Sequence, residues 1–181
     1  MKQISTPAIR LFIICFVCTL ALGLCSEITK EPIAAQAVKT QTEAMSAVFP
    51  DAVFEEATLD SETPGVTKVN LGKDSDGNLK GFVVNVDTNG FGGTISMMVG
   101  IDTEGTITGL RILSLSETPG LGAKATDSSF YEQFTGMSGD LAVTKDGGDV
   151  QAITSATITS RAVTSGANAA LKWFEENGGA Y

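Results

Sequence analysis

The sequence predicts an α+β fold class: an N-terminal transmembrane helix followed by one domain with a mainly antiparallel sheet and packed helices. An apolar run occupies residues 11–24, and from Phe54 to Leu115 apolar and polar residues alternate between clusters of turn-forming residues. Apolar residues then recur at helical spacing over residues 161–177. Because short turns join antiparallel neighbours, the alternating runs are expected to form an antiparallel sheet.

The composition restricts the chemistry that the chain can perform. Its 181 residues are 43% hydrophobic, enough for one domain with a real core, and carry a net charge of −9. We therefore expect no binding to nucleic acid. The chain has no histidine, and its three cysteines, Cys15, Cys18 and Cys25, lie in or beside the apolar run. The remaining body lacks the usual ligands of zinc, haem and iron–sulfur clusters, so redox chemistry there needs an organic cofactor.

The apolar run over residues 11–24 is preceded by Lys2 and Arg10 and is long enough to cross a bilayer with some thinning. Positive charge on its N-terminal side predicts a cytoplasmic N-terminus and a body outside. A cleaved signal peptide is the alternative, because the apolar core is short. No small-residue cleavage site precedes the body, and Leu24 is too large for a lipoprotein site. We expect residues 1–25 to be the cytoplasmic N-terminus and an uncleaved anchor.

Residues 26–53 are expected to form a separate amphipathic helix that connects the anchor to the domain, with Pro32 in its first turn and Pro50 ending it. The residues spaced for its apolar face are Val38, Gln41, Met45, Val48 and Phe49. The domain itself is assigned to residues 54–181. This division follows the change from helical spacing to alternation.

Within residues 54–181, two hairpins, a short helix that begins near Asp127, two further short strands and a last helix are expected. The expected strands lie near residues 67–71, 82–86, 95–101, 107–115, 141–143 and 150–153. In the last helix, Trp173 is expected to serve packing, and Gly178 follows the helix as a stop.

Residues 154–160, just before the last helical pattern, hold five hydroxyl side chains and no charge. A helix N-terminus offers unpaired N–H groups and the positive end of the helix dipole, so small hydroxyl residues there suit a phosphate. A threonine there can also carry a phosphate covalently. The alternative is that Thr159 or Ser160 caps the helix and the others form a solvated loop. Spacing alone favours this second interpretation.

The loop over residues 116–126 is too long for a tight turn. Pro119 fixes its backbone while nearby glycines permit conformations closed to other residues, so the loop could approach a flat ring closely. Glu117 and Lys124 would then flank the ring with opposite charges. The alternative is a glycine-rich surface loop. Residues 61–65 repeat its first five letters but run into a strand, so no second site is expected there.

The run Ile-Thr-Ser-Ala-Thr-Ile-Thr-Ser at residues 153–160 looks like the Ser/Thr-Gly-Ala-Thr-x-Thr-Ser signature of FMN-binding domains that hold flavin through a phosphoester to threonine. Residues 116–125 are similar to another signature of that family, and residues 90–93 followed by 98–102 also resemble it. Over about residues 1–177 the chain resembles the G subunit of Rnf-type ferredoxin:NAD oxidoreductase. The C subunit of the sodium-pumping NADH:quinone reductase is a more distant relative.

The resemblance implies a membrane-anchored electron-carrier subunit with FMN esterified to Thr157, attached by a separate flavin transferase that uses FAD and magnesium. The other cofactor-binding residues that it implies are Thr154, Ser155, Ala156, Ile158, Thr159, Glu117, Thr118, Gly120, Leu121, Lys124 and Gly92. Ser155 stands where the family has glycine, which would cost about 1 kcal/mol or somewhat more if the backbone needs a positive φ there.

The resemblance further implies that residues 54–181 are the FMN-binding domain, on the extracytoplasmic side of the cell (inner) membrane. Its partners would be the other membrane and redox subunits of a complex that passes electrons between ferredoxin and NAD and moves protons or sodium. Three alternatives stay open: a flavin-free extracytoplasmic binding or assembly module, a single-protein flavin reductase, and a peripheral flavoprotein of another reductase.

Overall fold

The computed structural model describes residues 2–57 and 63–180, with side chains described from residue 7 onward. The chain divides into two units, residues 1–40 and 41–181. The first unit is the N-terminal part of helix α1 (Lys2–Val48), and the second holds the last turns of α1 together with all the other elements. Ser61 and Glu62, which begin the repeated letters noted above, lie outside the described residues.

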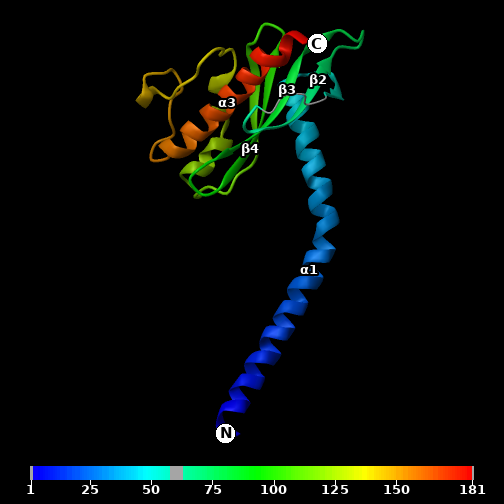
Figure 1. Cartoon of the computed structure of the whole chain (residues 1–181), viewed down its shortest axis with the longest axis vertical. Helices are drawn as coiled ribbons and strands as arrows, with labels where there is room; N and C mark the ends of the chain where they lie inside the picture. The colour runs from blue at the N-terminus through cyan, green and yellow to red at the C-terminus, as the bar shows by residue number, and fades with distance from the viewer. Residues whose placement is uncertain (1, 58–62, 181) are drawn as a thin grey trace. The chain divides into compact units, whose positions relative to one another are not determined.

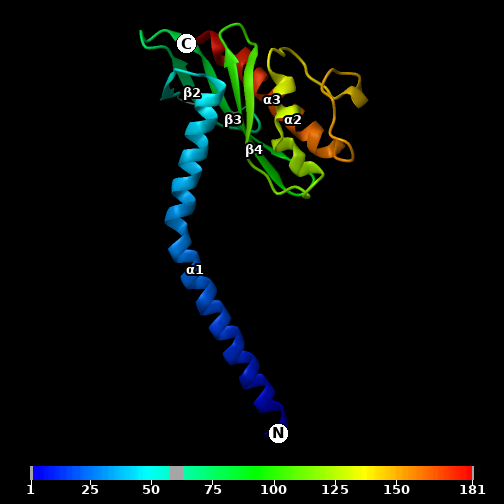
Figure 2. The same ribbon diagram turned by 180° about the vertical axis from the view of Figure 1, so that it is seen from behind.

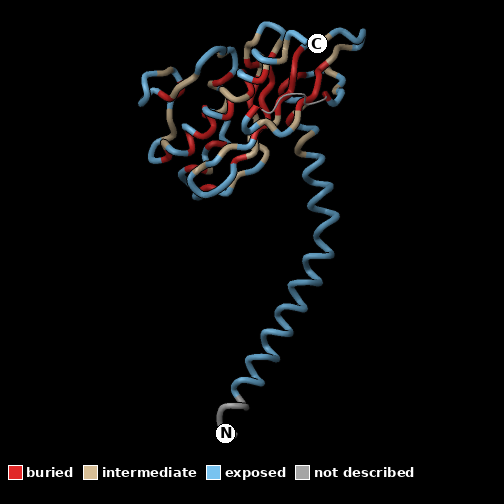
Figure 3. The backbone as a smooth tube through the Cα atoms, in the orientation of Figure 1, coloured by how far each residue is buried: buried red, intermediate tan, exposed pale blue. Residues whose placement is uncertain are grey.

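Helix α1 is continuous, with Pro7 and Pro32 inside it. Residues 26–48 are helical, as expected, but they continue α1 from its N-terminal part, so no new helix begins near Pro32. A proline removes one backbone donor, and the stretch after Pro32 contains several strong helix formers, such as Ala34, Ala35 and Gln36, that allow the helix to continue. Large apolar side chains of the N-terminal unit are exposed; Phe12, for example, is 70% exposed. Figure 3 colours the described backbone of this unit as exposed almost throughout. By length and composition, Pro7–Val48 could cross a membrane, a criterion that a signal sequence also meets.

The second unit is built on a five-stranded antiparallel sheet whose strands are neighbours in chain order (Figure 1). The strands are β1 (Val53–Glu56), β2 (Val66–Lys73), β3 (Leu79–Asn89), β4 (Thr94–Asp102) and β5 (Ile107–Ser114). Short turns join β2 to β5 in sequence; in the first of them, Asp74 Oδ1 accepts the N–H groups of Asp76 and Asn78 at 2.9 Å. The α+β fold class and the two predicted hairpins are confirmed.

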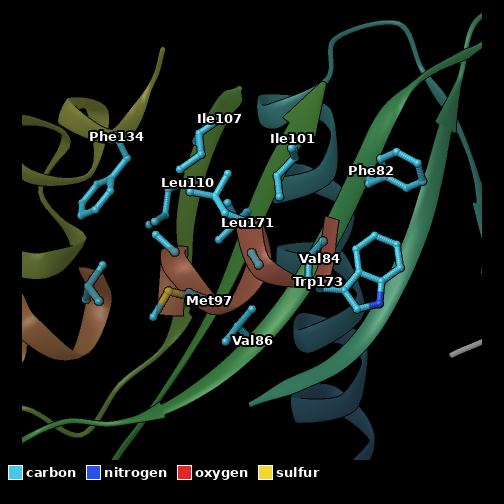
Figure 4. Packing of buried hydrophobic residues seen from close by; sticks show 14 of the residues in the cluster. Phe82, Val84, Val86, Met97, Ile101, Ile107, Leu110, Phe134, Leu171 and Trp173 are labelled. Atoms are coloured by element: carbon cyan, nitrogen blue, oxygen red, sulfur yellow. The ribbon is translucent and has the colours of Figure 1, made fainter. Parts of the chain in front are cut away.

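One face of the sheet is covered by helix α3 (Thr157–Asn177), which lies across β3 and β4 (Figure 1). The main core fills the space between them (Figure 4). Trp173 is 1% exposed and meets the ring of Phe82 edge to face, with centroids 5.4 Å apart. The packing role expected for this tryptophan is confirmed, because its ring is enclosed by the sheet.

The opposite face of the sheet receives the last turn of α1 (Figure 2). Four strand glycines leave room for it: Gly72, Gly81, Gly100 and Gly109. A Cβ atom on Gly100 would lie 1.8 Å from Val48 Cγ1, and one on Gly81 would lie 2.7 Å from the Phe49 ring. Val48 and Phe49 are buried, as the predicted apolar face requires, whereas Val38 of the same predicted face is 65% exposed. The glycines therefore form the seat of the α1 C-terminus.

After β5 the chain forms short helical segments: η1 (Gly122–Thr126), α2 (Ser128–Tyr131), η2 (Glu132–Phe134) and η3 (Thr144–Asp146). Helix α2 begins after Asp127, as predicted. The two short strands expected near residues 141–143 and 150–153 are wrong, because this segment has one isolated bridge between Val143 and Val150 around η3. Each valine is 1% exposed. Burial in the core, rather than sheet pairing, accounts for the apolar pattern.

Candidate functional site

Helix α3 begins inside the run of hydroxyl residues, at Thr157, and its N-cap is Ala156. The expectation that Thr159 or Ser160 caps the helix is therefore wrong. Ser160 Oγ instead accepts the N–H of Ile153 at 2.9 Å and donates to the carbonyl of Ala156 at 3.0 Å. These bonds fold the preceding loop back onto the helix. The N–H groups of the first turn keep no intrahelical acceptor, as at any helix N-terminus.

Ser155 adopts a φ of 64°, in the left-handed region that favours glycine. The backbone at this position does need a positive φ, the condition under which serine was expected to be costly. This left-handed residue lies just before the start of α3, where Ala156 and Thr157 line a cavity. Serine keeps the turn at a cost of about 1 kcal/mol relative to glycine.

Glu117 connects three segments of the site. Its Oε1 accepts the N–H groups of Phe91 at 2.7 Å and Gly92 at 3.2 Å, and its Oε2 accepts the hydroxyl of Thr159 at 3.0 Å. The side chain is 8% exposed. A Cβ atom on Gly122 would lie 2.5 Å from Glu117 Oε2, so glycine is needed there for close approach. The carboxylate therefore fixes the loop at residues 90–93 and the loop after β5 against the start of α3.

Together these segments line an open cavity of about 390 Å³. The residues that line it are Phe91, Glu117, Thr118, Leu121, Gly122, Ser155, Ala156, Thr157, Ile158 and Thr159. Three apolar side chains on its wall are exposed: Phe91 at 69%, Leu121 at 41% and Ile158 at 52%. The cavity thus combines a helix start that suits an anion with apolar surface that suits a flat ring.

The structure brings most of the sequence-predicted site residues to this cavity, but not all of them. Lys124 and Thr154 line a different cavity, of about 460 Å³, so Glu117 and Lys124 do not flank one common space. Gly92 does not line the cavity but donates its N–H group to Glu117, which does. Gly120 adopts a φ of 77° and does not line the cavity. Lys124 follows Gly122 in η1, whose turn carries the lysine side chain to the other cavity.

Comparison with known proteins connects this geometry to a family. A model described as an FMN-binding domain matches residues 90–172. The chain is 38% identical to the G subunit of the Na(+)-translocating ferredoxin:NAD(+) oxidoreductase complex of Acetobacterium woodii, over 96% of this chain and 93% of that one. It is 35% identical to the G subunit of an ion-translocating oxidoreductase complex of Methanosarcina acetivorans, over 95% of each. The chain belongs to the family of G subunits of ion-translocating oxidoreductase complexes.

Solved structures agree with this assignment. The C subunit of the Na(+)-translocating NADH-quinone reductase of Parabacteroides distasonis matches with a TM-score of 0.50 and 25% identity, over 60% of this chain and 61% of that one. NqrC of Shewanella oneidensis matches with a TM-score of 0.51 and 21% identity over 74% and 73%, which shows a shared fold. Both parts of the family resemblance read from the sequence are confirmed.

In this G-subunit family member, the match to the FMN-binding family begins at Gly90, in the loop that is bound to Glu117, and it ends within α3. It therefore includes every residue that lines the cavity. Within the described part of the chain, no group of three or more His, Cys, Asp and Glu side chains could hold a metal ion. The cavity offers hydroxyls, backbone N–H groups and apolar walls as its binding chemistry.

Sequence reasoning missed Lys145 at this site. Its Nζ lies 2.8 Å from Thr157 Oγ1 and donates to it. The next residue, Asp146, accepts two hydrogen bonds from Arg161, Nε to Oδ2 at 2.6 Å and Nη2 to Oδ1 at 2.5 Å. The hydrogen bonds from Arg161 lower the pKa of Asp146, and the carboxylate raises the pKa of Arg161. No sequence signal pointed to Lys145, because it lies twelve positions before Thr157 in an irregular segment.

Proposed function

We propose that this chain is a membrane-anchored electron-carrier subunit of an ion-translocating oxidoreductase, with FMN held through a phosphoester to Thr157. The observation that carries the proposal is the position of the Thr157 hydroxyl, at the start of a 21-residue helix and on the wall of the cavity. The names of the relatives in A. woodii and M. acetivorans supply the class of complex.

The start of α3 fits the phosphate of FMN. Thr157 would supply the ester oxygen, and the N–H groups of the first turn would face the remaining phosphate oxygens. Ala156 is small, so it leaves the approach to the backbone open. Ser155, which precedes Ala156, lines the same cavity with a positive φ of 64°. A phosphate there also meets the positive end of the helix dipole.

The apolar wall fits the ring system. Phe91, Leu121 and Ile158 expose apolar surface that a flat ring would cover, while Thr118 offers a hydroxyl at the same cavity. Bound FMN would supply reversible electron transfer, which no side chain of the body provides. A covalent link holds the cofactor whatever its affinity, so the cavity can stay open and leave a ring edge accessible to neighbouring redox groups.

The membrane role follows from α1 and from the complexes to which the relatives belong. We place the N-terminus in the cytoplasm and the FMN-binding domain on the extracytoplasmic side of the cell membrane, because Lys2 and Arg10 precede the apolar run. Membrane and redox subunits of the complex would be its partners. A flavin transferase using FAD and magnesium would attach the cofactor.

Intact mass tests the covalent link. Protein from the native membrane, or from a host with the transferase, should gain about 438 Da, the mass of FMN minus water for a phosphoester. Thr157→Ala should abolish the gain. Thr135→Ala is the matched control, since this exposed threonine lies outside the hydroxyl run and lines neither cavity, and it should keep the full gain.

Each other result has a specific meaning. A native wild-type protein without added mass contradicts the covalent link. Absence of flavin absorbance as well would support a flavin-free binding or assembly module. Flavinylated protein that purifies without oxidoreductase subunits would indicate a peripheral flavoprotein of another reductase, and turnover of a soluble acceptor by the chain alone would indicate a single-protein flavin reductase.

A further inference from the structure

Four hydroxyl side chains line the cavity, and the structure distinguishes them: Thr118, Ser155, Thr157 and Thr159. Thr159 is 1% exposed and its hydroxyl proton is directed to Glu117. Thr118 and Ser155 are exposed to solvent. Among these four, Thr157 is the one whose oxygen receives a hydrogen bond from an ammonium group, that of Lys145. The chain therefore marks one hydroxyl with a positive charge.

Lys145 is held at this position by its neighbours in η3. Val143, two residues earlier, is 1% exposed and forms the bridge with Val150. Asp146, the next residue, is bound through both carboxylate oxygens to Arg161 on the second turn of α3. Within the described part of the chain, Lys145 forms no ion pair with a carboxylate, because Arg161 holds the adjacent one. The Lys145 charge also helps to lower the pKa of Asp146, but the hydrogen bond that its ammonium group donates goes to Thr157.

We propose that Lys145 selects Thr157 as the flavin acceptor and supports the transfer step; the proposal rests on the function proposed above. In that step the Thr157 Oγ1–H bond breaks and a bond forms from Oγ1 to the FMN phosphorus of FAD. The bond from that phosphorus to the oxygen of the AMP phosphate breaks, AMP leaves, and the hydroxyl proton passes to a base of the transferase. No electron is gained or lost.

The physical role of Lys145 is electrostatic. Negative charge develops on Oγ1 as its proton leaves, and the incoming phosphorus carries anionic oxygens, so a fixed ammonium group stabilises both. The same hydrogen bond orients the oxygen lone pairs of Thr157. Loss of one charge-assisted hydrogen bond of this kind slows a transfer by about 10- to 100-fold. A purely structural role would leave the rate of transfer to a folded chain unchanged.

The test is a time course of mass gain. Full-length protein in detergent is incubated with purified transferase, FAD and magnesium, and Lys145→Met is compared with wild type and with Lys145→Arg. We expect transfer to Lys145→Met to be about 10- to 100-fold slower, and Lys145→Arg to recover most of the rate. Lys172→Met is the matched control: it removes a lysine from the exposed side of α3, near Glu176, and should react at the wild-type rate.

The outcomes separate the two proposals. Equal rates for wild type and Lys145→Met overturn the role of Lys145 while the covalent link stands. A wild-type chain that gains no mass from the active transferase overturns both. Thermal unfolding of each variant must match wild type, and if Lys145→Met is less stable, Lys145→Gln replaces it. If Lys145→Arg is as slow as Lys145→Met, the electrostatic role is overturned. Mapping of the wild-type protein by tandem mass spectrometry should find flavin on Thr157 alone.

Discussion

Glu117 is expected to hold the site together through its coupling to Thr159. Replacing Glu117 by leucine removes the acceptor of three hydrogen bonds. The N–H groups of Phe91 and Gly92 lie on exposed residues and can turn to water. Thr159 is 1% exposed, so its hydroxyl cannot reach water, and most of the loss of stability comes from this one unsatisfied group. Together with the two exchanged bonds we expect Glu117→Leu to lower the free energy of unfolding by about 2–4 kcal/mol.

The measurement is urea unfolding of the full chain in detergent, followed by the fluorescence of Trp173, the one tryptophan of the sequence. Its ring is buried against Phe82, so its emission reports on the core of the second unit. Thr159→Val completes a double-mutant cycle with Glu117→Leu. A coupling of about 1–2 kcal/mol is expected, because the double variant leaves no orphaned hydroxyl. Additive effects, or a loss below about 1 kcal/mol for Glu117→Leu, would refute this reasoning.

The remaining predictions use the same unfolding measurement. Gly100→Ala should lower the free energy of unfolding by at least about 1–3 kcal/mol, because its Cβ would lie 1.8 Å from Val48 Cγ1. Val48→Ala should restore part of this loss. If the effects of the two substitutions simply add, the packing of the α1 C-terminus on this glycine is not the cause of the loss. Ser155→Gly should gain up to about 1 kcal/mol by relieving the positive φ of 64°, and a destabilised variant would speak against that strain. Arg161 lowers the pKa of Asp146, so the stability that this pair contributes is present above the ordinary carboxyl pKa of 3.8 and is lost as the pH falls through the lowered value. Asp146→Asn should therefore be less stable than wild type at neutral pH and approach it in acid; a difference independent of pH would exclude the ion pair as its cause.

Local patterns were sufficient for most of the fold. Alternation between turn residues predicted β2 to β5, because alternate residues of each strand face α3 and short turns join neighbouring strands. The pattern failed at residues 141–153, where Val143 and Val150 are buried without joining the sheet. In the sequence, a single buried valine in an irregular segment cannot be distinguished from the centre of a short strand. Pro32 likewise suggested a helix start, although the residues around it continue α1.

The candidate site was predicted from two motifs, and the two were brought to one cavity by contacts that no motif contains. Glu117 was expected to flank a ring together with Lys124; Glu117 lines the cavity, and its carboxylate also binds the segment at residues 90–93 and Thr159. Lys124 and Thr154 are carried to a second cavity. Their neighbours in sequence are cavity residues, so a motif gives the neighbourhood of a side chain but not the direction in which the backbone turns it.

The sequence by itself determined the strand pattern, the apolar N-terminal segment, the hydroxyl run and the family, since each of these is a property of neighbouring residues. Only the tertiary structure decided that α3 starts at Thr157, that Ser155 has a positive φ, and that Lys145 reaches the threonine oxygen. The physical reason is that these three features depend on where the core holds Val143, Val150 and α3. Contacts between residues that are distant in the chain leave no periodic pattern in the sequence.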